Sequence, residues 1–414
     1  MSTTRPSSPG QNARLNLGAS TRPCVLLFLC LAFPLAALAQ TFTSLVEFNQ
    51  TNGANPEGTL VEGIDGNFYG TTQFGGANGL GAVYQVTPQG ALTTLYSFCN
   101  VSACTDGMQP FAGLRLGFDQ NFYGTTIHTV YRITTAGQLA TLYTFCSQPN
   151  CADGDVAYAT LVQAPGGDFY GTTYEGGAKT LMCQSGCGTV FKITPLGALT
   201  SIYTFHGKDG QGPIAGLVQG SDGNFYGTTS GGGTHGFGTV FKITPEGALT
   251  LLHSFGGADG AAPDARLLQA SDGSFYGTTV SGGGANGDGA IFKITAAGKF
   301  TLLRTFNYAN GAALYDSLVQ ASDGNFYGTT YTGGTAPNPC PGACGTIFRL
   351  TPSGRLTTLY NFCSQSGCAD GGAPFAGLLL ATDGNFYGTT AFGGSTVCSA
   401  YGSCGTIFKL SLVP

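Results

Sequence analysis

The sequence predicts an all-β protein that folds as a seven-bladed β-propeller, with four antiparallel strands per blade. The phrase Phe-Tyr-Gly-Thr-Thr occurs seven times, at steps of 47 to 60 residues, beginning at Phe68, Phe122, Phe169, Phe225, Phe275, Phe326 and Phe386. Each copy is flanked by short segments rich in aromatic and β-branched residues, which glycine-rich turns separate. A repeat of about 50 residues with four such segments is typical of a propeller blade.

An offset between the repeats and the chain ends predicts how the ring closes. Residues 41–48 match the fourth strand of a repeat, whereas residues 405–412 match the third. We therefore expect the N-terminal strand to complete the last blade, which would remove the exposed edge of an open array. A parallel β-helix is the alternative fold, but it needs shorter coils and does not explain this offset.

The fourth repeat shows the expected elements in order. Ser221-Asp-Gly223 forms a tight turn after the first strand, because Asp-Gly tolerates the positive φ angles of a hairpin. A glycine-rich loop at 231–238 separates the second and third strands, and Pro245-Glu-Gly247 is the turn before the fourth. The four strands are expected at 216–219, 224–229, 239–244 and 248–255.

Two details of the repeats carry further expectations. A glycine inside a strand is costly, so its recurrence in the motif predicts a close backbone approach or a bulge near the crowded axis. In the second repeat Thr126-Ile-His128 replaces the glycine-rich loop, so this blade should have the shortest loop between its second and third strands.

The first 39 residues are expected to be a secretory signal peptide, followed by the propeller at 40–414. Arg5, Arg14 and Arg22 form a basic region, residues 25–38 are apolar, and Ala37-Leu38-Ala39 fits a cleavage site. A retained membrane anchor is the alternative. After cleavage we expect no membrane span and a secreted protein, extracellular or periplasmic.

Charge excludes some classes of partner. Without the first 39 residues the chain keeps 13 basic and 21 acidic residues, a formal net charge of −8. Nucleic acids and anionic membranes both require clustered Lys and Arg, so neither is an expected partner. The 68 glycines have no collagen-like period, which assigns them to turns.

The cysteines predict local disulfides. Cys24 and Cys30 lie in the expected signal peptide, and the other twelve form close pairs, as is usual in exported proteins. The pairs are Cys99/Cys104, Cys146/Cys151, Cys183/Cys187, Cys340/Cys344, Cys363/Cys368 and Cys398/Cys404. The alternative is a four-thiolate zinc site made by the fourth and fifth of these pairs.

The repeat resembles a known family. Asp-Gly-Asn-Phe-Tyr-Gly-Thr-Thr, followed by Gly-Thr-Val-Phe-Lys-Ile-Thr-Pro and Gly-Ala-Leu-Thr-Thr-Leu-Tyr-Ser-Phe, is similar to the GloVer (Gloeo/Verruco) tandem repeat of choice-of-anchor bacterial surface proteins. The resemblance covers nearly all of residues 41–412 and implies an exported protein without an established activity. The Asp-Gly-Asn turn also gives a more distant likeness to propellers of the streptogramin-lyase type.

A recurring carboxylate is the main candidate for a binding site. An Asp-Gly turn follows the fourth strand of most repeats, on the face that also carries the loops between second and third strands. A ring of carboxylates there suits Ca²⁺ or sugar hydroxyls, although Asp also simply stabilises such turns. The candidates are Asp106, Asp153, Asp209, Asp259 and Asp370, with Asn52 and Asn310 completing the ring.

Other candidates are weaker. The seven motif tyrosines either line a channel, where they would stack on a glycan, or pack between blades. The four histidines are scattered and fit no metal or triad pattern, so we assign no catalytic residue and no metal site. The tyrosines are Tyr69, Tyr123, Tyr170, Tyr226, Tyr276, Tyr327 and Tyr387.

These observations favour a monomeric, secreted or cell-surface module that binds a glycan or a protein. No cofactor is expected, Ca²⁺ at the carboxylate ring being the one ion considered. Two other classes remain open. One is a lyase or glycan-processing enzyme with its site on the loop face, by which we mean the face that carries the loops between second and third strands. The other is a structural surface protein.

Overall fold

The computed structural model describes residues 40–335, 344–394 and 404–412. The expected signal peptide, residues 1–39, lies outside these ranges. Within them, no helix has the length and apolar character needed to cross a membrane.

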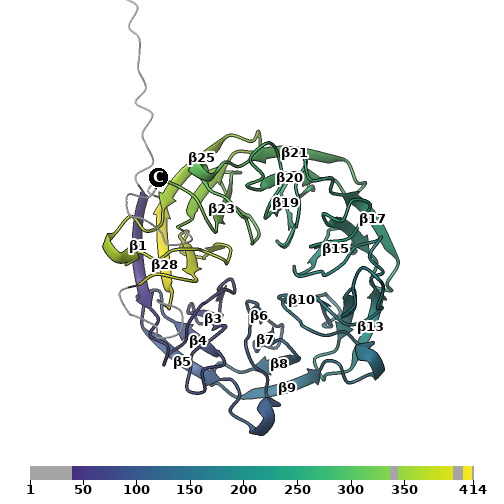
Figure 1. The fold of residues 1–414 in the computed structure, drawn as a ribbon. Coiled ribbons are helices and arrows are strands. Elements are labelled where there is room, and N and C mark those ends of the chain that lie inside the picture. Colours follow the sequence, from purple (N-terminus) through teal and green to yellow (C-terminus); the bar gives the residue numbers. More distant parts are fainter. Residues whose placement is uncertain (1–39, 336–343, 395–403, 413–414) are drawn as a thin grey trace, which may run out of the picture. The chain divides into compact units, whose positions relative to one another are not determined.

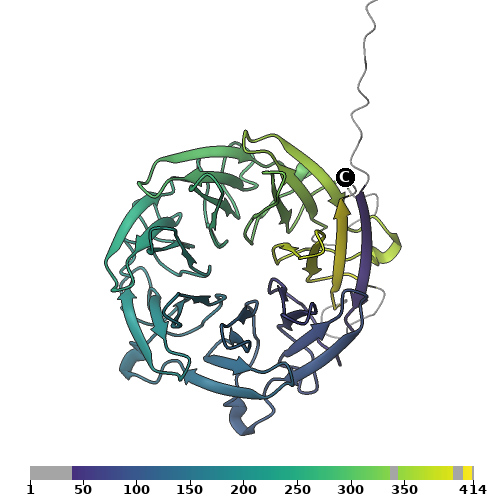
Figure 2. The same ribbon diagram turned by 180° about the vertical axis from the view of Figure 1, so that it is seen from behind.

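Seven four-stranded antiparallel sheets form the blades of a ring, which confirms the predicted propeller (Figure 1). The first strand of each blade lies nearest the axis and the fourth at the outer rim, as the view from behind also shows (Figure 2). Blades 1 to 3 comprise β2 (Val61–Glu62), β3 (Phe68–Thr72), β4 (Ala82–Val86) and β5 (Leu92–Ser97); β6 (Arg115–Leu116), β7 (Phe122–Thr125), β8 (Thr129–Ile133) and β9 (Leu139–Thr144); and β10 (Val162–Gln163), β11 (Phe169–Thr173), β12 (Thr189–Ile193) and β13 (Leu199–Thr204).

The remaining blades repeat this order. Blades 4 to 7 comprise β14 (Val218–Gln219), β15 (Phe225–Thr229), β16 (Thr239–Ile243) and β17 (Leu249–Ser254); β18 (Leu268–Gln269), β19 (Phe275–Thr279), β20 (Ala290–Ile294) and β21 (Phe300–Thr305); β22 (Val319–Gln320), β23 (Phe326–Thr330), β24 (Thr346–Leu350) and β25 (Leu356–Asn361); and β26 (Leu379–Leu380), β27 (Phe386–Thr390), β28 (Thr406–Leu412) and β1 (Gln40–Glu47). Short 3-10 helices follow four of the outer strands: η1 (Ser102–Cys104), η2 (Pro149–Cys151), η3 (Tyr308–Asn310) and η4 (Ser366–Cys368).

The N-terminal strand closes the ring, as the offset predicts. β1 pairs antiparallel with β28, in a register that runs from Gln40 opposite Leu412 to Glu47 opposite Thr406. The Phe48 amide then donates to the Gly405 carbonyl at 3.0 Å, which extends the pairing beyond the strand. β1 therefore supplies the outer strand that completes the last sheet.

The motif tyrosine of each blade packs on the motif phenylalanine of the next. The Tyr226 and Phe275 rings stack with centroids 3.9 Å apart, and Tyr387 meets Phe68 at 4.2 Å across the closure. The seven tyrosine side chains are at most 4% exposed, which supports packing between blades over channel lining. The other pairs are Tyr69–Phe122, Tyr123–Phe169, Tyr170–Phe225, Tyr276–Phe326 and Tyr327–Phe386.

The same tyrosine also anchors the turn before it. The Tyr226 hydroxyl donates to Oδ2 of Asp222 at 2.8 Å, while Oδ1 accepts from the Asn224 amide at 3.2 Å. Burial alone would raise the pKa of Asp222, but the hydrogen bonds from Asn224 and Tyr226 outweigh burial and lower it. The Asp-Gly-Asn turn thus fixes the tyrosine ring that reaches the next blade.

Close approach explains the recurring glycine, but the approaching groups are side chains, and the expected backbone approach or bulge near the axis is not what occurs there. A Cβ added at Gly171 would lie 2.5 Å from Cζ of Phe191 and 2.9 Å from Cδ2 of Leu161. The approaching groups are side chains of the third strand and of the segment that precedes the first. The short loop expected in the second repeat is confirmed, because three residues separate β7 from β8, whereas nine separate β15 from β16.

Deleting residues 40–48 is expected to open the ring. The deletion exposes the edge of β28 and removes the side chains of Val46 and Phe48, which are 8% and 1% exposed. We expect a loss of about 5 kcal/mol or more in unfolding free energy, together with self-association. Urea unfolding and size-exclusion chromatography test this, and a monomer of unchanged stability would contradict the closure.

Tyr226→Ala is expected to cost about 3–5 kcal/mol in unfolding free energy, because it removes a buried ring between two blades. Tyr226→Phe is the matched control, which keeps the ring and loses the hydrogen bond to Asp222, at a cost of about 1 kcal/mol. Urea unfolding of both variants separates the two effects. Equal losses would assign the stability to the hydroxyl group instead of the contact between rings.

Candidate functional site

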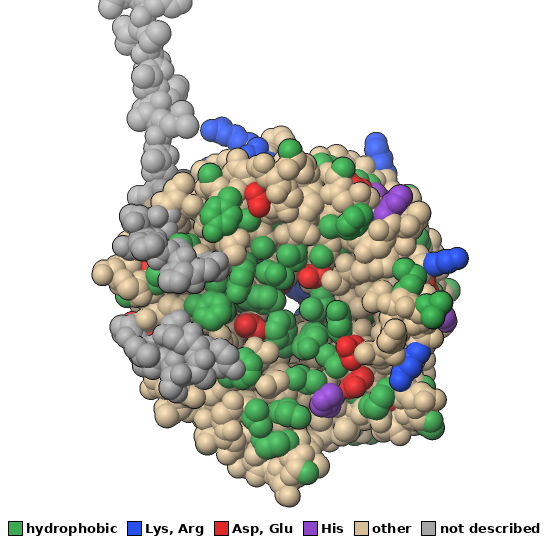
Figure 3. Space-filling model, viewed as in Figure 1, with side chains coloured by type: hydrophobic (Ala, Val, Ile, Leu, Met, Phe, Trp, Pro, Cys, Tyr) green, Lys and Arg blue, Asp and Glu red, His purple; other side chains and the backbone are tan. Residues whose placement is uncertain are grey.

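A cavity of about 410 Å³ lies at the centre of the ring, and residues of all seven blades line it. Viewed along the axis, hydrophobic side chains gather around the central opening with acidic side chains among them (Figure 3). One residue per blade, eleven positions before the motif phenylalanine, forms what we call the channel collar. The collar consists of Glu57, Phe111, Tyr158, Ile214, Asp264, Tyr315 and Phe375.

Repeated contacts hold each collar segment in place. Three positions after the collar residue every repeat has a buried leucine, such as Leu217, which is fully buried. The first motif threonine of the preceding blade fixes the backbone, since Thr172 Oγ1 donates to the Ala215 carbonyl at 3.0 Å. Thr389 Oγ1 donates to the Pro56 carbonyl at 2.8 Å, on the other side of its collar residue, Glu57. The collar side chain is thus free to differ while its backbone stays constant.

Four collar residues form a continuous row of rings, the aromatic arc, which consists of Phe111, Tyr158, Tyr315 and Phe375. The Tyr315 and Phe375 rings stack with centroids 4.6 Å apart. Phe111 lies 5.1 Å from Phe375 on one side and 5.1 Å from Tyr158 on the other. Tyr174, at the start of the loop between β11 and β12, contacts Tyr158 at 5.9 Å, so the arc lies toward the loop face.

Two collar residues, Glu57 and Asp264, are the channel carboxylates. Burial raises the pKa of Glu57 to about 7. Burial also raises the pKa of Asp264 to about 6, although a hydrogen bond with Ser230 lowers it in part. Oε2 of Glu57 and Oδ1 of Asp264 are buried and have no hydrogen-bond partner among the described residues. These oxygens are therefore buried acceptors whose hydrogen-bonding capacity the described residues leave unused.

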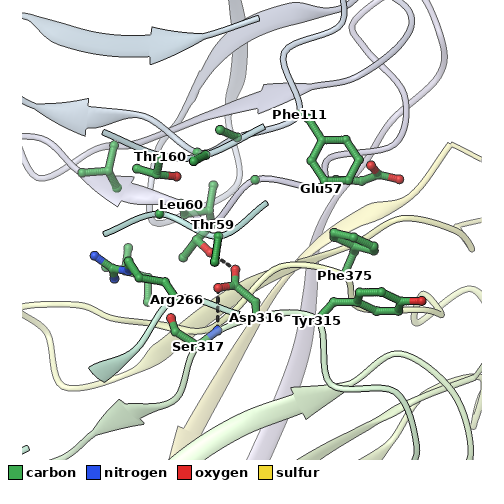
Figure 4. A pocket seen from close by; sticks show the side chains of 18 of the residues that line it. Glu57, Thr59, Leu60, Phe111, Thr160, Arg266, Tyr315, Asp316, Ser317 and Phe375 are labelled. Carbon is green, nitrogen blue, oxygen red and sulfur yellow. Dashed lines mark hydrogen bonds between the residues drawn. The ribbon is translucent and has the colours of Figure 1, made fainter. Parts of the chain in front are cut away.

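The interior beyond the collar has different chemistry (Figure 4). Asp316 accepts hydrogen bonds from the Thr59 hydroxyl and from the Gly377 amide, the latter at 2.6 Å. Arg115 and Arg266 also line the channel. Burial, and after it the positive charge of Arg266, lowers the pKa of Arg115. Figure 4 shows Arg266 on the opposite side of the view from Phe111, Phe375 and Tyr315, with Asp316 between them.

The carboxylates predicted from the Asp-Gly turns stabilise their own loops. Oδ2 of Asp153 accepts from the Tyr143 hydroxyl at 2.8 Å and from the Ser147 amide at 3.0 Å. Asp370 makes the same two contacts in blade 6, with Tyr360 and Ser364. Asp106, Asp209 and Asp259 likewise accept from their own loops.

Asparagine serves equally well at this turn position. The Asn49 amide donates to Oδ1 of Asn52 at 2.9 Å, and the Asn307 amide donates to Oδ1 of Asn310 at 3.0 Å. None of the five predicted aspartates is among the described residues that line the channel. Ligand binding by these aspartates stays a prediction.

Local disulfides are confirmed for four of the six predicted cysteine pairs. Each of the four bonds joins cysteines that are four or five residues apart, within a single loop. The bonded pairs are Cys99–Cys104, Cys146–Cys151, Cys183–Cys187 and Cys363–Cys368.

The other two predicted pairs, Cys340/Cys344 and Cys398/Cys404, fall only partly within the described residues. Cys344 and Cys404 are described, are 6% and 0% exposed, and are each disulfide-bonded. Their predicted partners, Cys340 and Cys398, lie outside the described residues. The assignment of these two bonds to those partners therefore stays a prediction.

The same bonds bear on the alternative zinc site. A four-thiolate site needs free, deprotonated cysteines, and a cysteine in a disulfide cannot supply a thiolate. Cys344, Cys363 and Cys368, three of the four ligands considered, are disulfide-bonded. The disulfide interpretation is therefore favoured over the zinc site.

The collar is absent from the residues predicted from the sequence, although a signal for it exists. When the seven repeats are aligned on the motif, the collar position carries Glu, Phe, Tyr, Ile, Asp, Tyr and Phe. The position three residues later is leucine in every copy. The invariant leucine marks a position that the fold requires in every repeat. The variable collar position beside it is one where a binding site can differ from blade to blade.

Comparisons with known proteins agree with the fold. The model of a family described as the Gloeobacter/Verrucomicrobia repeat matches residues 180–408, and no curated protein matches the chain. A solved structure of streptogramin B lyase shares 14% identity at a TM-score of 0.60, over 90% of this chain and 98% of the lyase.

Two other solved structures are described as extracellular domains of hybrid two-component systems from B. thetaiotaomicron. They share 13% and 8% identity, with TM-scores of 0.56 and 0.58, over 89% of this chain. The chain spans about two fifths of each, 41% and 40%. At these identities the three structures show the propeller fold alone.

Asp153→Ala is expected to loosen its loop without unfolding the propeller. Burial alone would raise the pKa of Asp153, but hydrogen bonds from Tyr143, Ser147 and Gln148 outweigh burial and lower it. Asp153 therefore stabilises the folded loop at pH values above the pKa that it has in the unfolded chain. This stabilisation is lost as the pH falls through the lower pKa of the folded state, below about pH 4.

Hydrogen exchange of residues 146–154 measures this effect. We expect faster exchange in the variant at pH 7, and a smaller difference from the unsubstituted protein near pH 3. The midpoint of thermal unfolding should change little, because the substitution leaves the contacts between strands in place. Cooperative loss of the whole ring in the variant would contradict a purely local role.

Proposed function

This chain belongs to the Gloeobacter/Verrucomicrobia repeat family, and we propose that it is a secreted or cell-surface binding module that holds a small ligand in the aromatic end of its central channel.

The observation that carries the proposal is the contrast between the collar and its surroundings. The contacts that build the ring recur in all seven blades, whereas the collar has five different residue types in seven positions. A ring that needed only to close would be served by one small apolar residue at each of these positions. Instead the collar joins four aromatic rings into an arc and adds two carboxylates.

The size and chemistry of the cavity are those of a ligand site. Pockets for small molecules usually measure about 300–1,000 Å³ and combine apolar walls with a few polar groups. The cavity of about 410 Å³ falls in this range. The carboxylate oxygens that have no partner among the described residues supply polar groups for a ligand.

The disulfides support an oxidising compartment. Bonded cysteine pairs persist in secreted and periplasmic proteins and are rare in the cytosol. The four described bonds lie within single loops, so they stabilise loops instead of the blades. This arrangement fits a module whose ligand approaches from that face.

An enzyme of lyase or glycan-processing type is the second candidate. The observation that favours it is the pair of channel carboxylates with raised pKa values, since perturbed carboxylates in a cavity are typical of general acids and bases. Conversion of a bound ligand into product would distinguish this candidate from a binding module.

A thermal-shift screen of monosaccharides, disaccharides, alkylammonium ions and carboxylic acids tests the proposal. A ligand that binds only the folded state raises the unfolding midpoint, by an amount that grows with the logarithm of its concentration relative to its Kd. We expect at least one compound class to do so, and we expect Tyr158→Ala with Phe375→Ala to weaken its binding by about tenfold or more.

Leu196→Ala is the control, because Leu196 is 93% exposed, lies in the turn between β12 and β13, and does not line the channel. Binding that survives the two aromatic substitutions would place the ligand elsewhere. Failure of every compound class would overturn the proposed function.

A further inference from the structure

We propose that the aromatic end of the channel binds an organic cation, in which an ammonium group lies against the aromatic arc and is neutralised by the channel carboxylates. This inference rests on the proposed function and names the class of its ligand.

The first step is that the channel carboxylates have no cationic partner in the described part of the chain. Among the described residues neither Glu57 nor Asp264 forms an ion pair, whereas Asp168, Asp272 and Asp383 each pair with a lysine. Within the same ranges, one oxygen of each channel carboxylate is also without a hydrogen bond. Burying a carboxylate without a partner is costly, and a ligand cation would remove that cost.

The second step is that the basic residues of the channel lie elsewhere. Figure 4 shows Arg266 on the other side of the view from Glu57 and from three rings of the arc, Phe111, Tyr315 and Phe375. Arg115 and Arg266 are close enough for the charge of Arg266 to lower the pKa of Arg115. The channel therefore has an acidic, aromatic end and a basic end, and a cation is attracted to the first.

The third step concerns the rings. The faces of aromatic side chains attract cations, by about 0.5–1 kcal/mol at exposed sites and about 2 kcal/mol or more at desolvated ones. The four rings of the arc are half-buried and line one cavity. Alkylammonium groups are recognised by the faces of aromatic rings, and a row of four rings offers such faces to the cavity.

The fourth step separates a cation from a neutral sugar. Apart from the hydroxyl groups of Tyr158 and Tyr315, the polar groups of the collar side chains are carboxylate acceptors. Deeper in the channel the Thr59 hydroxyl already donates to Asp316, and the donor groups of Arg115 and Arg266 lie at the basic end. A sugar hydroxyl needs donors as well as acceptors, whereas an ammonium group needs acceptors and rings alone.

Protonation of the channel carboxylates should compete with the cation. Tyr331 faces Glu57, and Ser230 and Tyr315 face Asp264. The other charged residues that line the cavity are Arg115, Arg266 and Asp316. With pKa values of about 7 and about 6, the channel carboxylates lose their charge as the pH falls from 8 to 5, so cation affinity should fall over the same range.

Choline and its neutral isostere 3,3-dimethylbutan-1-ol are the probes, measured by isothermal titration calorimetry with the purified protein at pH 8. We expect choline to bind at least about tenfold more tightly than the isostere, a difference that the positive charge alone supplies. Lowering the pH to 5 should weaken the binding of choline by about tenfold or more and leave the affinity for the isostere unchanged.

Glu57→Gln tests the assigned carboxylate, because it removes the charge and keeps the shape. We expect about tenfold weaker choline binding. Glu246→Gln is the matched control, since Glu246 is exposed in a turn outside the channel. If Glu57→Gln does not fold, the pH comparison in the unsubstituted protein decides instead.

Equal affinity for the two probes, or choline binding that is independent of pH between 8 and 5, would overturn this inference. So would an absence of choline binding. A different outcome separates the two proposals. If a saccharide binds, its binding is lost in the Phe375→Ala variant and choline fails to bind, the proposed function stands and the inference of a cationic ligand is refuted. Failure of all probes and of the whole screen would refute both.

Discussion

The contact between the motif tyrosine of one blade and the motif phenylalanine of the next is the interaction on which the structure depends. Each tyrosine packs by its ring face on the neighbouring blade, and in blade 4 its hydroxyl is also fixed by the aspartate of its own turn. Two different constraints, a local turn and a long-range contact, thus act on one side chain. The tyrosine–phenylalanine contacts, repeated seven times, set the position of each blade relative to the next. They therefore also set the width of the central cavity.

This explains why the collar can vary. A propeller that depended on its axis for cohesion would need well-packed side chains there. Here the blades are held together by the tyrosine–phenylalanine contacts and by hydrogen bonds from motif threonines to the backbone of the neighbouring collar segment. Neither kind of contact involves a collar side chain. One oxygen of Glu57 and one of Asp264 have no hydrogen bond from a described residue. The free-energy cost of burying these oxygens appears as raised pKa values of the two carboxyl groups, and the contacts between blades are left intact.

The sequence predicts the fold well because blade, turn and closure all follow from regular spacing. Residues 41–48 could be assigned to the last blade since strand type is readable from the motif, and the structure pairs them with β28. The site was not predictable by the same means. The Asp-Gly carboxylates recur because their turns recur, so recurrence drew attention to residues such as Asp153 that bond within their own loops. The collar repeats in position but not in residue type, and a search for shared residues passes over it.

The pairing of β1 with β28 also fixes the order in which the molecule can be completed during synthesis. Within the propeller, β1 precedes all the other strands in the chain and its partner β28 follows them, with Gln40 opposite Leu412. Blades 1 to 6 can form in turn, since each consists of consecutive strands. β1 must wait unpaired until β28 is available. The closing step is thus a late event, and a chain interrupted before β28 would hold both an unpaired strand and an unclosed ring, the state that quality-control proteases and chaperones recognise.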